Sequence, residues 1–317
     1  MIDLSIIVVS YNTRVLTLEC LRSVQKETRD INFELIVVDN DSPDGSAAAI
    51  KAEFPDINLI ALKENVGFAP ANILAAKVAR GRRFLLLNPD TVILDRAIDH
   101  LVAFANENPS CGIWGGRTLF SDRSLNPCSC WRNMTLWSLT CFTFGLSYLA
   151  PNSPIFNSEA YGGWNRNSVR YVDIVTGCLF LIDQDLWDKL EGFDPSFFMY
   201  GEEADLCHRA QKLGARPIVT PRATIIHYGG ASTVSTVKQQ LLLLRAKTTL
   251  LNRHWRPASR QLGRALFLVG IIIRCSAYRL ASLVVSRPDL KATAVKWRMM
   301  WQRRGEWIDG YDPATNS

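Results

Sequence analysis

The sequence predicts an α/β fold in which helices flank a mostly parallel central sheet. Runs of consecutive apolar, largely β-branched residues recur along the first ninety residues, as in strands that are buried on both faces. A segment with apolar residues at helical spacing follows each run, and this alternation is typical of a doubly wound parallel sheet. The 317 residues include 48% hydrophobic and 21% charged residues, which argues against a disordered chain.

Strands and helices are expected in strict alternation through the first part of the chain. Strands are predicted at residues 4–9, 33–38, 58–62 and 84–87, and helices at residues 15–25, 47–54 and 70–79. Residues 117–170 break this pattern, because Trp, Cys, Asn, Ser and Pro replace the apolar runs. Further strands are predicted at residues 171–182 and 223–226, and the chain beyond Ser235 is predicted to be helical.

Polar side chains follow three of these predicted strands at the point where each strand ends. They are Ser10, Tyr11 and Asn12 after the first strand, Asp39 after the second, and Asn88 and Asp90 after the fourth. Each of these loops taken alone is explained by the ordinary preference of Asn, Asp, Ser and Pro for turns. Together they predict a ligand site, because ligands bind beyond the carboxyl ends of parallel strands. The chain has no GxGxxG after the first strand and no GxxxxGK(S/T), so neither a dinucleotide oxidoreductase nor a P-loop protein is indicated.

Three carboxylates, Glu202, Glu203 and Asp205, fall within four residues just after the aromatic segment at residues 197–200. Burial beside aromatic rings raises the pKa of a carboxyl group. A carboxylate with a raised pKa suits a general base that works near neutral pH. The alternative is the first turn of a helix, where the helix dipole favours acidic side chains.

The charges divide the chain into an acidic body and a basic tail. Residues 238–304 contain 15 Lys or Arg and one acid, Asp289, whereas the remaining residues contain 21 basic and 29 acidic side chains. Such a tail favours a polyanion, either nucleic acid or an anionic membrane surface. Within residues 262–286, the longest uncharged run, residues 265–273, is too short to cross the roughly 30 Å hydrocarbon core.

We therefore expect the tail to form a helix that lies in the membrane interface. Its arginines at positions 256, 260, 264 and 274 fall on one side, which we interpret as the polar face, although Phe267 and Ile271 lie on that side too. The basic and aromatic residues 291–304, with Trp297 and Trp301, follow as a second interfacial segment. A helical cap on the body, or a dimer surface, is the alternative.

The eight cysteines form no CxxC pair and no zinc-ligand spacing. Scattered cysteines of this kind are typical of reduced thiols in the cytosol. The chain also begins with apolar residues directly after Asp3, without the basic stretch of a secretory signal. We expect a protein at the cytoplasmic face of the cell membrane, bound peripherally.

These motifs resemble the family 2 inverting glycosyltransferases of GT-A fold, and among them the rhamnosyltransferase-like branch that builds bacterial cell-surface polysaccharides. The segments that carry the resemblance are IIVVSYN (6–12), VVDN (37–40), NVGF (65–68), LNPD (87–90), VTGC (175–178), GFD (192–194), EEADL (202–206) and HYGGAS (227–232). It implies a Rossmann-like GT-A catalytic domain at residues 1–235, with a variable acceptor region at residues 117–170. Residues 236–317 would be the basic, helical, membrane-associating region.

The resemblance also implies a nucleotide-sugar site. Ser10, Tyr11 and Asn12 would line the base and ribose, and Asp39 would accept a hydrogen bond from the pyrimidine N3–H. The wall near the ribose and diphosphate would be formed by Asn65, Gly67 and Asn72, and Gly177 would lie beside the donor sugar. Asn88 stands where relatives have the first acid of an Asp-x-Asp motif, which leaves Asp90 as its acid. Asp90 and His227 would hold Mg²⁺ or Mn²⁺, unless His227 is an ordinary core histidine.

For the chemistry, the resemblance implies that Glu203 is the general base, in a position where relatives usually have Asp. Glu202 and Asp205 would orient neighbours or bind acceptor hydroxyls. Arg209 would form an intrahelical salt bridge with Asp205 or contact the diphosphate. Trp131 and Trp164, with Trp137 and Tyr161, are candidates for stacking on an acceptor sugar, and aromatic packing within the insertion is the alternative.

The expected activity is transfer of a sugar to a cell-surface polysaccharide or a polyprenyl-diphosphate-linked glycan. The first choice of donor is dTDP-L-rhamnose, with UDP-galactofuranose or a UDP-hexose as the alternative. Nucleic acid is not expected as a partner, and a homodimer is left open. A polyanion-binding scaffold with an inert α/β body is the competing class. A nucleotidyltransferase would need a basic Gly-rich loop after the first strand, and residues 10–13 do not form one.

Overall fold

The computed structural model describes residues 2–229, 236–285 and 287–311. The chain divides into two compact units. The sheet unit comprises Met1–Trp131, Asn165–Phe198 and Glu202–Ser232, and the helical unit comprises Arg132–Trp164, Met199–Gly201 and Thr233–Ser317. The domain boundary predicted at residue 235 and the motif residues 230–232 lie outside the described residues.

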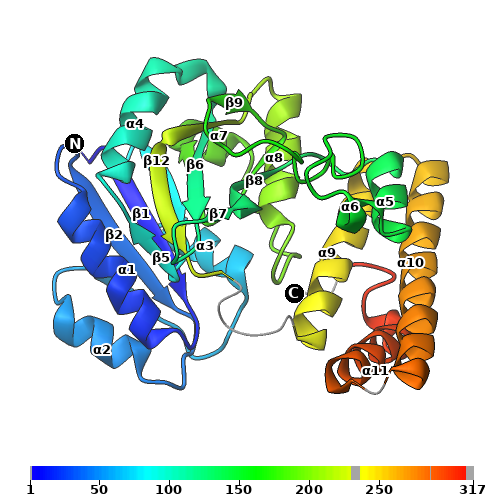
Figure 1. Cartoon of the computed structure of the whole chain (residues 1–317). Coiled ribbons are helices and arrows are strands. Elements are labelled where there is room, and N and C mark those ends of the chain that lie inside the picture. Colours follow the sequence, from blue (N-terminus) through cyan, green and yellow to red (C-terminus); the bar gives the residue numbers. More distant parts are fainter. Residues whose placement is uncertain (1, 230–235, 286, 312–317) are drawn as a thin grey trace. The chain divides into compact units, whose positions relative to one another are not determined.

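A ten-stranded mixed sheet forms the centre of the sheet unit (Figure 1). Its main path runs in the order β3 (Asn58–Ala61), β2 (Phe33–Asp39), β1 (Leu4–Ser10), β4 (Arg83–Leu87), β11 (Leu179–Asp183), β6 (Ile113–Leu119), β12 (Ile218–His227) and β5 (Thr91–Ile93). The first four strands are parallel, with Leu4 opposite Phe33 and Arg83. The predicted α/β fold with a mostly parallel sheet is confirmed.

Helices cover both faces of this sheet because its central strands are apolar on both sides. All seven residues of β1 are buried. Leu4, Ile6 and Val8 share a core with α1 (Arg14–Glu27), α2 (Ser46–Glu53) and α4 (Ala97–Glu107). On the opposite face lie α3 (Phe68–Ala76) and α7 (Gln184–Lys189), where the Trp187 ring meets Phe84 edge-on at 6.0 Å. Each fully buried large apolar side chain stabilises the fold by about 1.5 to 3 kcal/mol.

The strand directions bring four strand ends to one edge of the sheet. β11 is antiparallel to both β4 and β6, so β6 runs in the same direction as β4. β12 is parallel to β6 and therefore shares that direction as well. The carboxyl ends of β1, β2, β4 and β12 consequently meet at one edge, and the residues at these ends include Ser10, Asp39, Asn88 and His227.

The prediction of one continuous strand at residues 171–182 is wrong. It is divided into β9 (Arg170–Tyr171), β10 (Ile174–Val175) and β11. β9 pairs with β12, and β10 pairs with β8 (Cys130–Trp131) in a separate two-stranded sheet. The Thr176 hydroxyl donates a hydrogen bond to the Cys128 carbonyl at 2.7 Å, which holds the chain away from the main sheet between β10 and β11. Residues 176–178 thereby form a loop rather than a strand.

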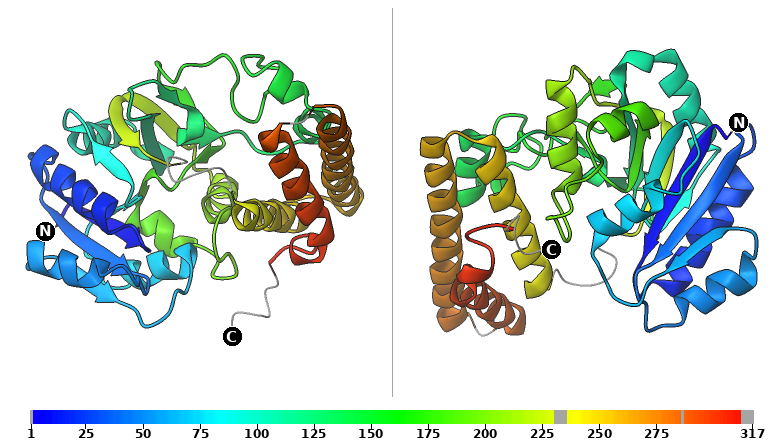
Figure 2. Two further views of the ribbon diagram at one scale, coloured as in Figure 1. Left: turned by 60° about the horizontal axis from the view of Figure 1, so that its bottom comes forward. Right: turned by 180° about the vertical axis from the view of Figure 1, so that it is seen from behind.

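The helical unit is a bundle in which α10 (Pro257–Val284) packs against α5 (Leu136–Thr143), α9 (Val237–His254) and α11 (Pro288–Gln302); Figure 2 shows the last three helices from two directions. Its core consists of Leu139, Leu241, Leu251, Phe267, Ile271, Met300 and Trp307. Thr236 begins α9 with a capping box to Gln239. An apolar cavity of about 660 Å³ lies among these helices.

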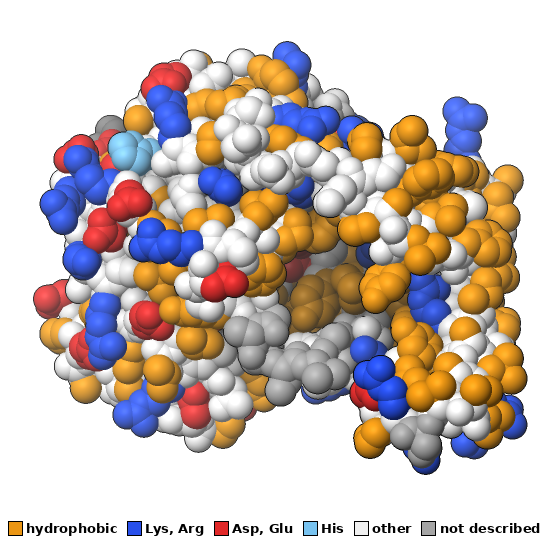
Figure 3. Space-filling view, in the orientation of Figure 1, with side chains coloured by type: hydrophobic (Ala, Val, Ile, Leu, Met, Phe, Trp, Pro, Cys, Tyr) orange, Lys and Arg blue, Asp and Glu red, His pale blue; other side chains and the backbone are white. Residues whose placement is uncertain are grey.

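The structure corrects the predicted polar face of α10. Phe267 and Ile271 are buried, and two of the arginines on their side are used inside the helical unit. Arg264 donates to Asn252 Oδ1 at 2.8 Å, and Arg274 donates to the carbonyls of Phe142 and Thr143. The exposed side of α10 is instead apolar, with Leu262, Val269, Ile272, Ile273, Leu280, Leu283 and Val284 (Figure 3).

The helix as a whole is also longer and more apolar than its short uncharged run predicts. α10 is one continuous helix of 28 residues, long and apolar enough by length and composition to cross a membrane. Core helices of soluble proteins can have the same length and apolar composition, but they are mostly buried, whereas only 17% of the most apolar window of α10 is buried. The helix thus has an apolar surface that the described residues leave largely uncovered.

Candidate functional site

Asp39 ends β2 as a buried carboxylate, with 3% of its surface exposed. Its Oδ2 accepts a hydrogen bond from the backbone N–H of Ser42 at 3.2 Å. Its Oδ1 is buried and has no hydrogen-bond partner among the described residues. A buried carboxylate oxygen without a donor is costly. This position therefore suits a ligand that donates a hydrogen bond, such as the N3–H of a pyrimidine.

The loop after β1 is joined to the loop after β2. The backbone N–H of Asn12, at a φ of 54°, donates to Ser42 Oγ at 2.9 Å. Ser10 is buried, and its hydroxyl lies 2.9 Å from that of Thr17, so it is engaged with α1. Tyr11 is 49% exposed. Of the three predicted base-site residues in this loop, Tyr11 offers a ring to a ligand, whereas Ser10 shapes the loop from inside.

The predicted wall residues hold the loop before α3 in one conformation. Asn65 Oδ1 accepts from the Asn40 side chain and from the backbone N–H of Gly67, both at 3.0 Å. Gly67 has a φ of +94°, and a Cβ there would lie 2.4 Å from the Phe198 carbonyl oxygen. Asn72 is buried and donates to the Phe68 carbonyl at 2.9 Å. Hydrogen bonds and the close approach of Phe198 thus define the conformation of this wall.

Asp90 and His227 meet at the sheet edge although they are far apart in the sequence. Asp90 Oδ1 lies 3.3 Å from His227 Nε2, and Asn88 Nδ2 lies 3.3 Å from the same nitrogen. Burial by itself would lower the pKa of His227, but hydrogen bonds with Asp90 and Cys128 outweigh it and raise the pKa to about 10. Acidic and thiol groups thus face the two ring nitrogens of His227, an arrangement that is compatible both with a metal ligand and with a buried histidine whose hydrogen bonds are satisfied.

This group fits a divalent cation such as Mg²⁺ or Mn²⁺. Asp90 supplies a carboxylate, its side chain is 24% exposed, and His227 supplies an imidazole nitrogen on the same side. Oxygen ligands suit Mg²⁺, and the addition of imidazole favours Mn²⁺. The proton on Nε2 has to leave before this nitrogen can coordinate a metal ion.

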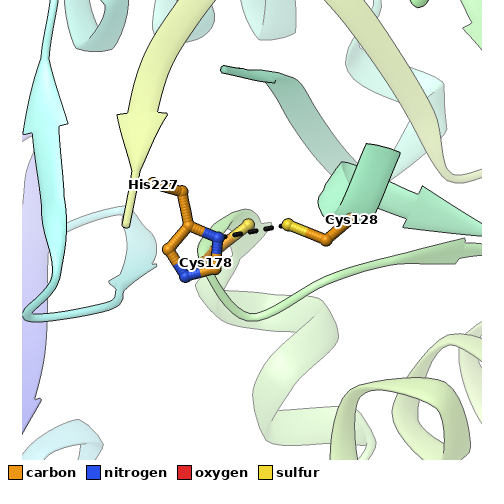
Figure 4. Close-up of side chains that lie close together, drawn as sticks. All are labelled: Cys128, Cys178 and His227. Carbon is orange, nitrogen blue, oxygen red and sulfur yellow. Dashed lines mark hydrogen bonds between the residues drawn. The ribbon is translucent and has the colours of Figure 1, made fainter. Parts of the chain in front are cut away.

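Two cysteines that the sequence did not indicate complete the surroundings of His227 (Figure 4). Cys128 Sγ lies 3.1 Å from His227 Nδ1, and the ligand atoms of Cys128, Cys178 and His227 all lie within 4.8 Å of one another. A hydrogen bond from Cys178 and the nearby His227 lower the pKa of Cys128 to about 5, against the effect of burial. The same hydrogen bond, with burial, raises the pKa of Cys178.

The acidic cluster lies at the start of α8 (Glu202–Lys212), which packs against β10. Glu202 is buried, and its burial together with the negative charge of Glu203 raises its pKa well above the ordinary value. Phe198, just before this helix, accepts a hydrogen bond from the backbone N–H of Phe68 at 2.7 Å. The segment that leads to the acidic pair is therefore tied to the wall of the predicted nucleotide site.

Asp205 is used differently from the two glutamates. It is buried, and its Oδ2 accepts from Arg209 Nε at 2.7 Å, four positions further along the helix. The other guanidinium nitrogens of Arg209 donate to the carbonyls of Leu190 at 2.6 Å and Gly192 at 2.9 Å. The alternative in which Arg209 forms an intrahelical salt bridge is thus the one observed. Asp205 and Arg209 fix α8 to the loop after α7.

The predicted sugar and acceptor contacts are spread over both units. A Cβ at Gly177 would lie 3.4 Å from the Phe68 ring, an ordinary contact, so protein packing does not itself require glycine there. Trp131 is half-buried in β8 of the sheet unit. Trp164 belongs to the helical unit and meets Tyr161 edge-on at 5.8 Å. Trp137, 49% exposed, donates to the Ile155 carbonyl.

Comparison with known proteins identifies similar sequences. Residues 5–169, more than half of the chain, match the model of the family described as "Glycosyl transferase family 2". The chain is 28% identical over 213 residues to the O-antigen biosynthesis protein RfbC of Myxococcus xanthus, covering 66% of this chain and only 16% of that protein. It is 26% identical over 211 residues to the N-acetylglucosaminyl-diphospho-decaprenol L-rhamnosyltransferase of Mycobacterium tuberculosis, covering 63% of this chain and 67% of that protein.

Two solved structures share the fold at low sequence identity. The mannosyltransferase PcManGT of Pyrobaculum calidifontis, in complex with GDP-Man and Mn²⁺, aligns with a TM-score of 0.55 at 16% identity, over 98% of this chain and 87% of its own. GalNAc-T7 with UDP, GalNAc and Mn²⁺ aligns with a TM-score of 0.53 at 15% identity, over 72% of this chain and 43% of its own. These likenesses confirm the predicted GT-A-like fold.

Proposed function

Since the chain belongs to glycosyl transferase family 2, we propose that it transfers a sugar from a nucleoside diphosphate to an acceptor hydroxyl with inversion at the anomeric carbon. The observation that carries this proposal is the meeting of Asp90 and His227 at the edge of the sheet where β2 also ends in Asp39. That edge thus offers a cation site for a diphosphate and a hydrogen-bond acceptor for a base. Family membership sets aside the alternative of an inert α/β body.

Glu203 is our choice of general base. It would accept the proton of the acceptor hydroxyl while the acceptor oxygen forms a bond to the anomeric carbon. The bond from that carbon to the diphosphate oxygen breaks, and the nucleoside diphosphate leaves with the electron pair. Burial and the nearby Glu203 raise the pKa of Glu202, which favours its protonated form and so reduces its repulsion of a negative charge on Glu203.

Asp90 and His227 would hold Mg²⁺ or Mn²⁺, and Asn88 would support them. When bound, such an ion stabilises the negative charge that develops on the leaving diphosphate. Asp205 and Arg209 act at a distance as positioning residues, because their ion pair and the two carbonyl contacts of Arg209 fix the helix that carries Glu203.

The donor we propose is dTDP-L-rhamnose. The likeness to a named L-rhamnosyltransferase supports it, at 26% identity. Asp39 Oδ1 suits the N3–H of thymine and of uracil equally, so UDP-galactofuranose or a UDP-hexose is the alternative. The base does not separate these donors, and the sugar has to be tested directly.

The acceptor we propose is a cell-surface polysaccharide or a polyprenyl-diphosphate-linked glycan. The apolar side of α10 supports a membrane-bound acceptor, since contiguous exposed apolar surfaces mark protein or membrane interaction sites. We also propose that the chain binds the cytoplasmic face of the membrane peripherally, with the apolar side of α10 in the interface. Trp131 and Trp164 remain the candidates for acceptor stacking.

Membrane association is tested by flotation of the full chain with anionic vesicles. Replacing Leu280, Leu283 and Val284 with Ser should weaken vesicle binding by roughly tenfold or more, because each buried CH₂ group contributes about 0.8 kcal/mol. Val15→Ser removes an equally exposed apolar side chain from α1 and should leave binding unchanged. Equal flotation of the triple variant and the native chain would rule out α10 as the membrane contact.

The donor is tested with a panel of nucleotide sugars in the presence of Mn²⁺. We expect dTDP-L-rhamnose to raise the thermal unfolding temperature most and to be hydrolysed slowly in the absence of acceptor. A stronger response to UDP-galactofuranose would replace rhamnose but keep the reaction class. No response to any nucleotide sugar would contradict the proposed function.

A further inference from the structure

Cys128, Cys178 and His227 form a compact ligand set on the side of the imidazole that faces away from Asp90. Cys128 lies just before β8, Cys178 lies in the loop before β11, and His227 ends β12. Their ligand atoms lie within 4.8 Å of one another, and two of the three side chains are buried (Figure 4). In a tetrahedral zinc site with two sulfurs and one nitrogen, the ligand atoms are roughly 3.5 to 4 Å apart. Small side-chain rotations would therefore bring the three groups to one ion.

The two ring nitrogens of His227 have different partners. Nδ1 faces Cys128 Sγ at 3.1 Å, whereas Nε2 faces Asp90 Oδ1 at 3.3 Å. Metal-binding histidines usually donate their second ring N–H to a carboxylate, which fixes the ring and strengthens it as a ligand. Asp90 stands in that place relative to an ion at Nδ1. The arrangement thus has both the ligands of a soft metal site and the carboxylate that supports the histidine.

We propose that Cys128 Sγ, Cys178 Sγ and His227 Nδ1 bind one soft divalent cation, for which Zn²⁺ is the best fit. Thiolate and imidazole ligands select zinc over Mg²⁺ or Ca²⁺. Three protein ligands leave the fourth position for water or another ligand. The two thiols lose their protons when the ion binds, since a cation compensates two adjacent thiolates that would otherwise repel each other.

This site has a consequence for the donor metal, and this step alone rests on the proposed function. With zinc at Nδ1, Nε2 keeps its proton and donates it to Asp90. His227 is then unable to coordinate Mn²⁺ through Nε2 at the same time. Zinc should therefore weaken the Mn²⁺-dependent binding of a nucleoside diphosphate.

Cobalt substitution tests the site without any measurement of activity. The reduced full chain is titrated with Co²⁺, and we expect one ion per chain with a sulfur-to-cobalt charge-transfer band and intense tetrahedral d–d bands. Cys128→Ala and Cys178→Ala should each lower the charge-transfer intensity and weaken Zn²⁺ binding at least tenfold in competition with a chromophoric chelator. Cys130→Ala is the matched control, since Cys130 is buried like Cys178, lies two positions from Cys128, and is outside the ligand set.

Cadmium NMR on the native chain covers the case in which a variant fails to fold. The chemical shift of bound ¹¹³Cd reports the number of thiolate ligands, and we expect the shift of a two-sulfur site. A shift typical of oxygen ligands only, or a cobalt complex without a charge-transfer band, would overturn the proposal. An unchanged spectrum in folded Cys128→Ala or Cys178→Ala would overturn it as well. Because no nucleotide is present, either result leaves the glycosyltransferase proposal standing.

Discussion

Asp39→Asn should weaken the binding of a pyrimidine nucleotide strongly without destabilising the protein. In the native chain, the buried Oδ1 of Asp39 has no hydrogen-bond donor among the described residues, and Oδ2 accepts a hydrogen bond from the Ser42 N–H at 3.2 Å. In the variant, the amide oxygen keeps the bond to Ser42, and the amide NH₂ then faces the N3–H of the base. A hydrogen bond to a charged group contributes about 1.5 to 3 kcal/mol, so binding should fall by roughly 10- to 150-fold.

Calorimetric titration with dTDP and UDP measures this loss, and thermal unfolding of the ligand-free protein measures stability. Unfolding should occur at an equal or higher temperature, because the variant removes a buried charge. Asp41→Asn, at an exposed position in the same loop, should change neither quantity. Unchanged nucleotide affinity in Asp39→Asn, or a loss of stability with affinity intact, would refute the reasoning and make Asp39 a structural residue.

Three further changes test other parts of the site. Glu203→Gln should abolish sugar transfer yet leave donor binding nearly intact by calorimetry, and loss of donor binding would make Glu203 structural. The pKa of His227 is raised from 6.5 to about 10, and that of its partner Cys128 is lowered from 9.0 to about 5. Folding therefore takes up a proton at the imidazole and releases one at the thiol, and these two contributions to the pH dependence of stability oppose each other between about pH 6.5 and 9. Above about pH 9 only the His227 contribution remains, and it is lost as the pH rises through about 10. Metal-free denaturant unfolding should therefore show little change in stability from about pH 6.5 to 9 and a loss above about pH 9 that is absent in His227→Gln, and a steady loss across the whole range would contradict this. Gly67→Ala should destabilise the protein by about 1 to 3 kcal/mol more than Gly214→Ala. Both glycines have a positive φ, but only at Gly67 would the added Cβ clash with a backbone oxygen, that of Phe198. Equal losses of stability in urea unfolding would refute this clash.

The sequence alone was sufficient to predict the strands that consist of continuous apolar runs. β1, β2 and β4 are buried and parallel, so the polar residues after them had to meet at one edge. That argument also places Asp39 and Asp90 correctly at strand ends. The division of residues 171–182 was out of reach, because the bend at residues 176–178 depends on the contact of Thr176 with the distant Cys128 carbonyl.

Two features of the site and of α10 depend on long-range packing in the same way. Cys128 and Cys178 belong to no local motif, and only the tertiary packing of the segments before β8 and β11 near the end of β12 brings them to His227. On α10, helical periodicity placed Arg274 and Ile271 on one side, but periodicity does not say which side faces the protein. That side faces the protein because Arg274 donates hydrogen bonds to carbonyls of α5, which lies far away in the sequence.

We propose above all that Asp90 and His227 hold a divalent cation for a nucleoside diphosphate. Calorimetric titration of the full chain with dTDP or UDP, with and without Mn²⁺, tests it most directly. We predict that Mn²⁺ strengthens binding in the native chain and has little effect in Asp90→Asn. Equal affinity with and without Mn²⁺ in the native chain, or an undiminished Mn²⁺ effect in Asp90→Asn, would contradict the claim.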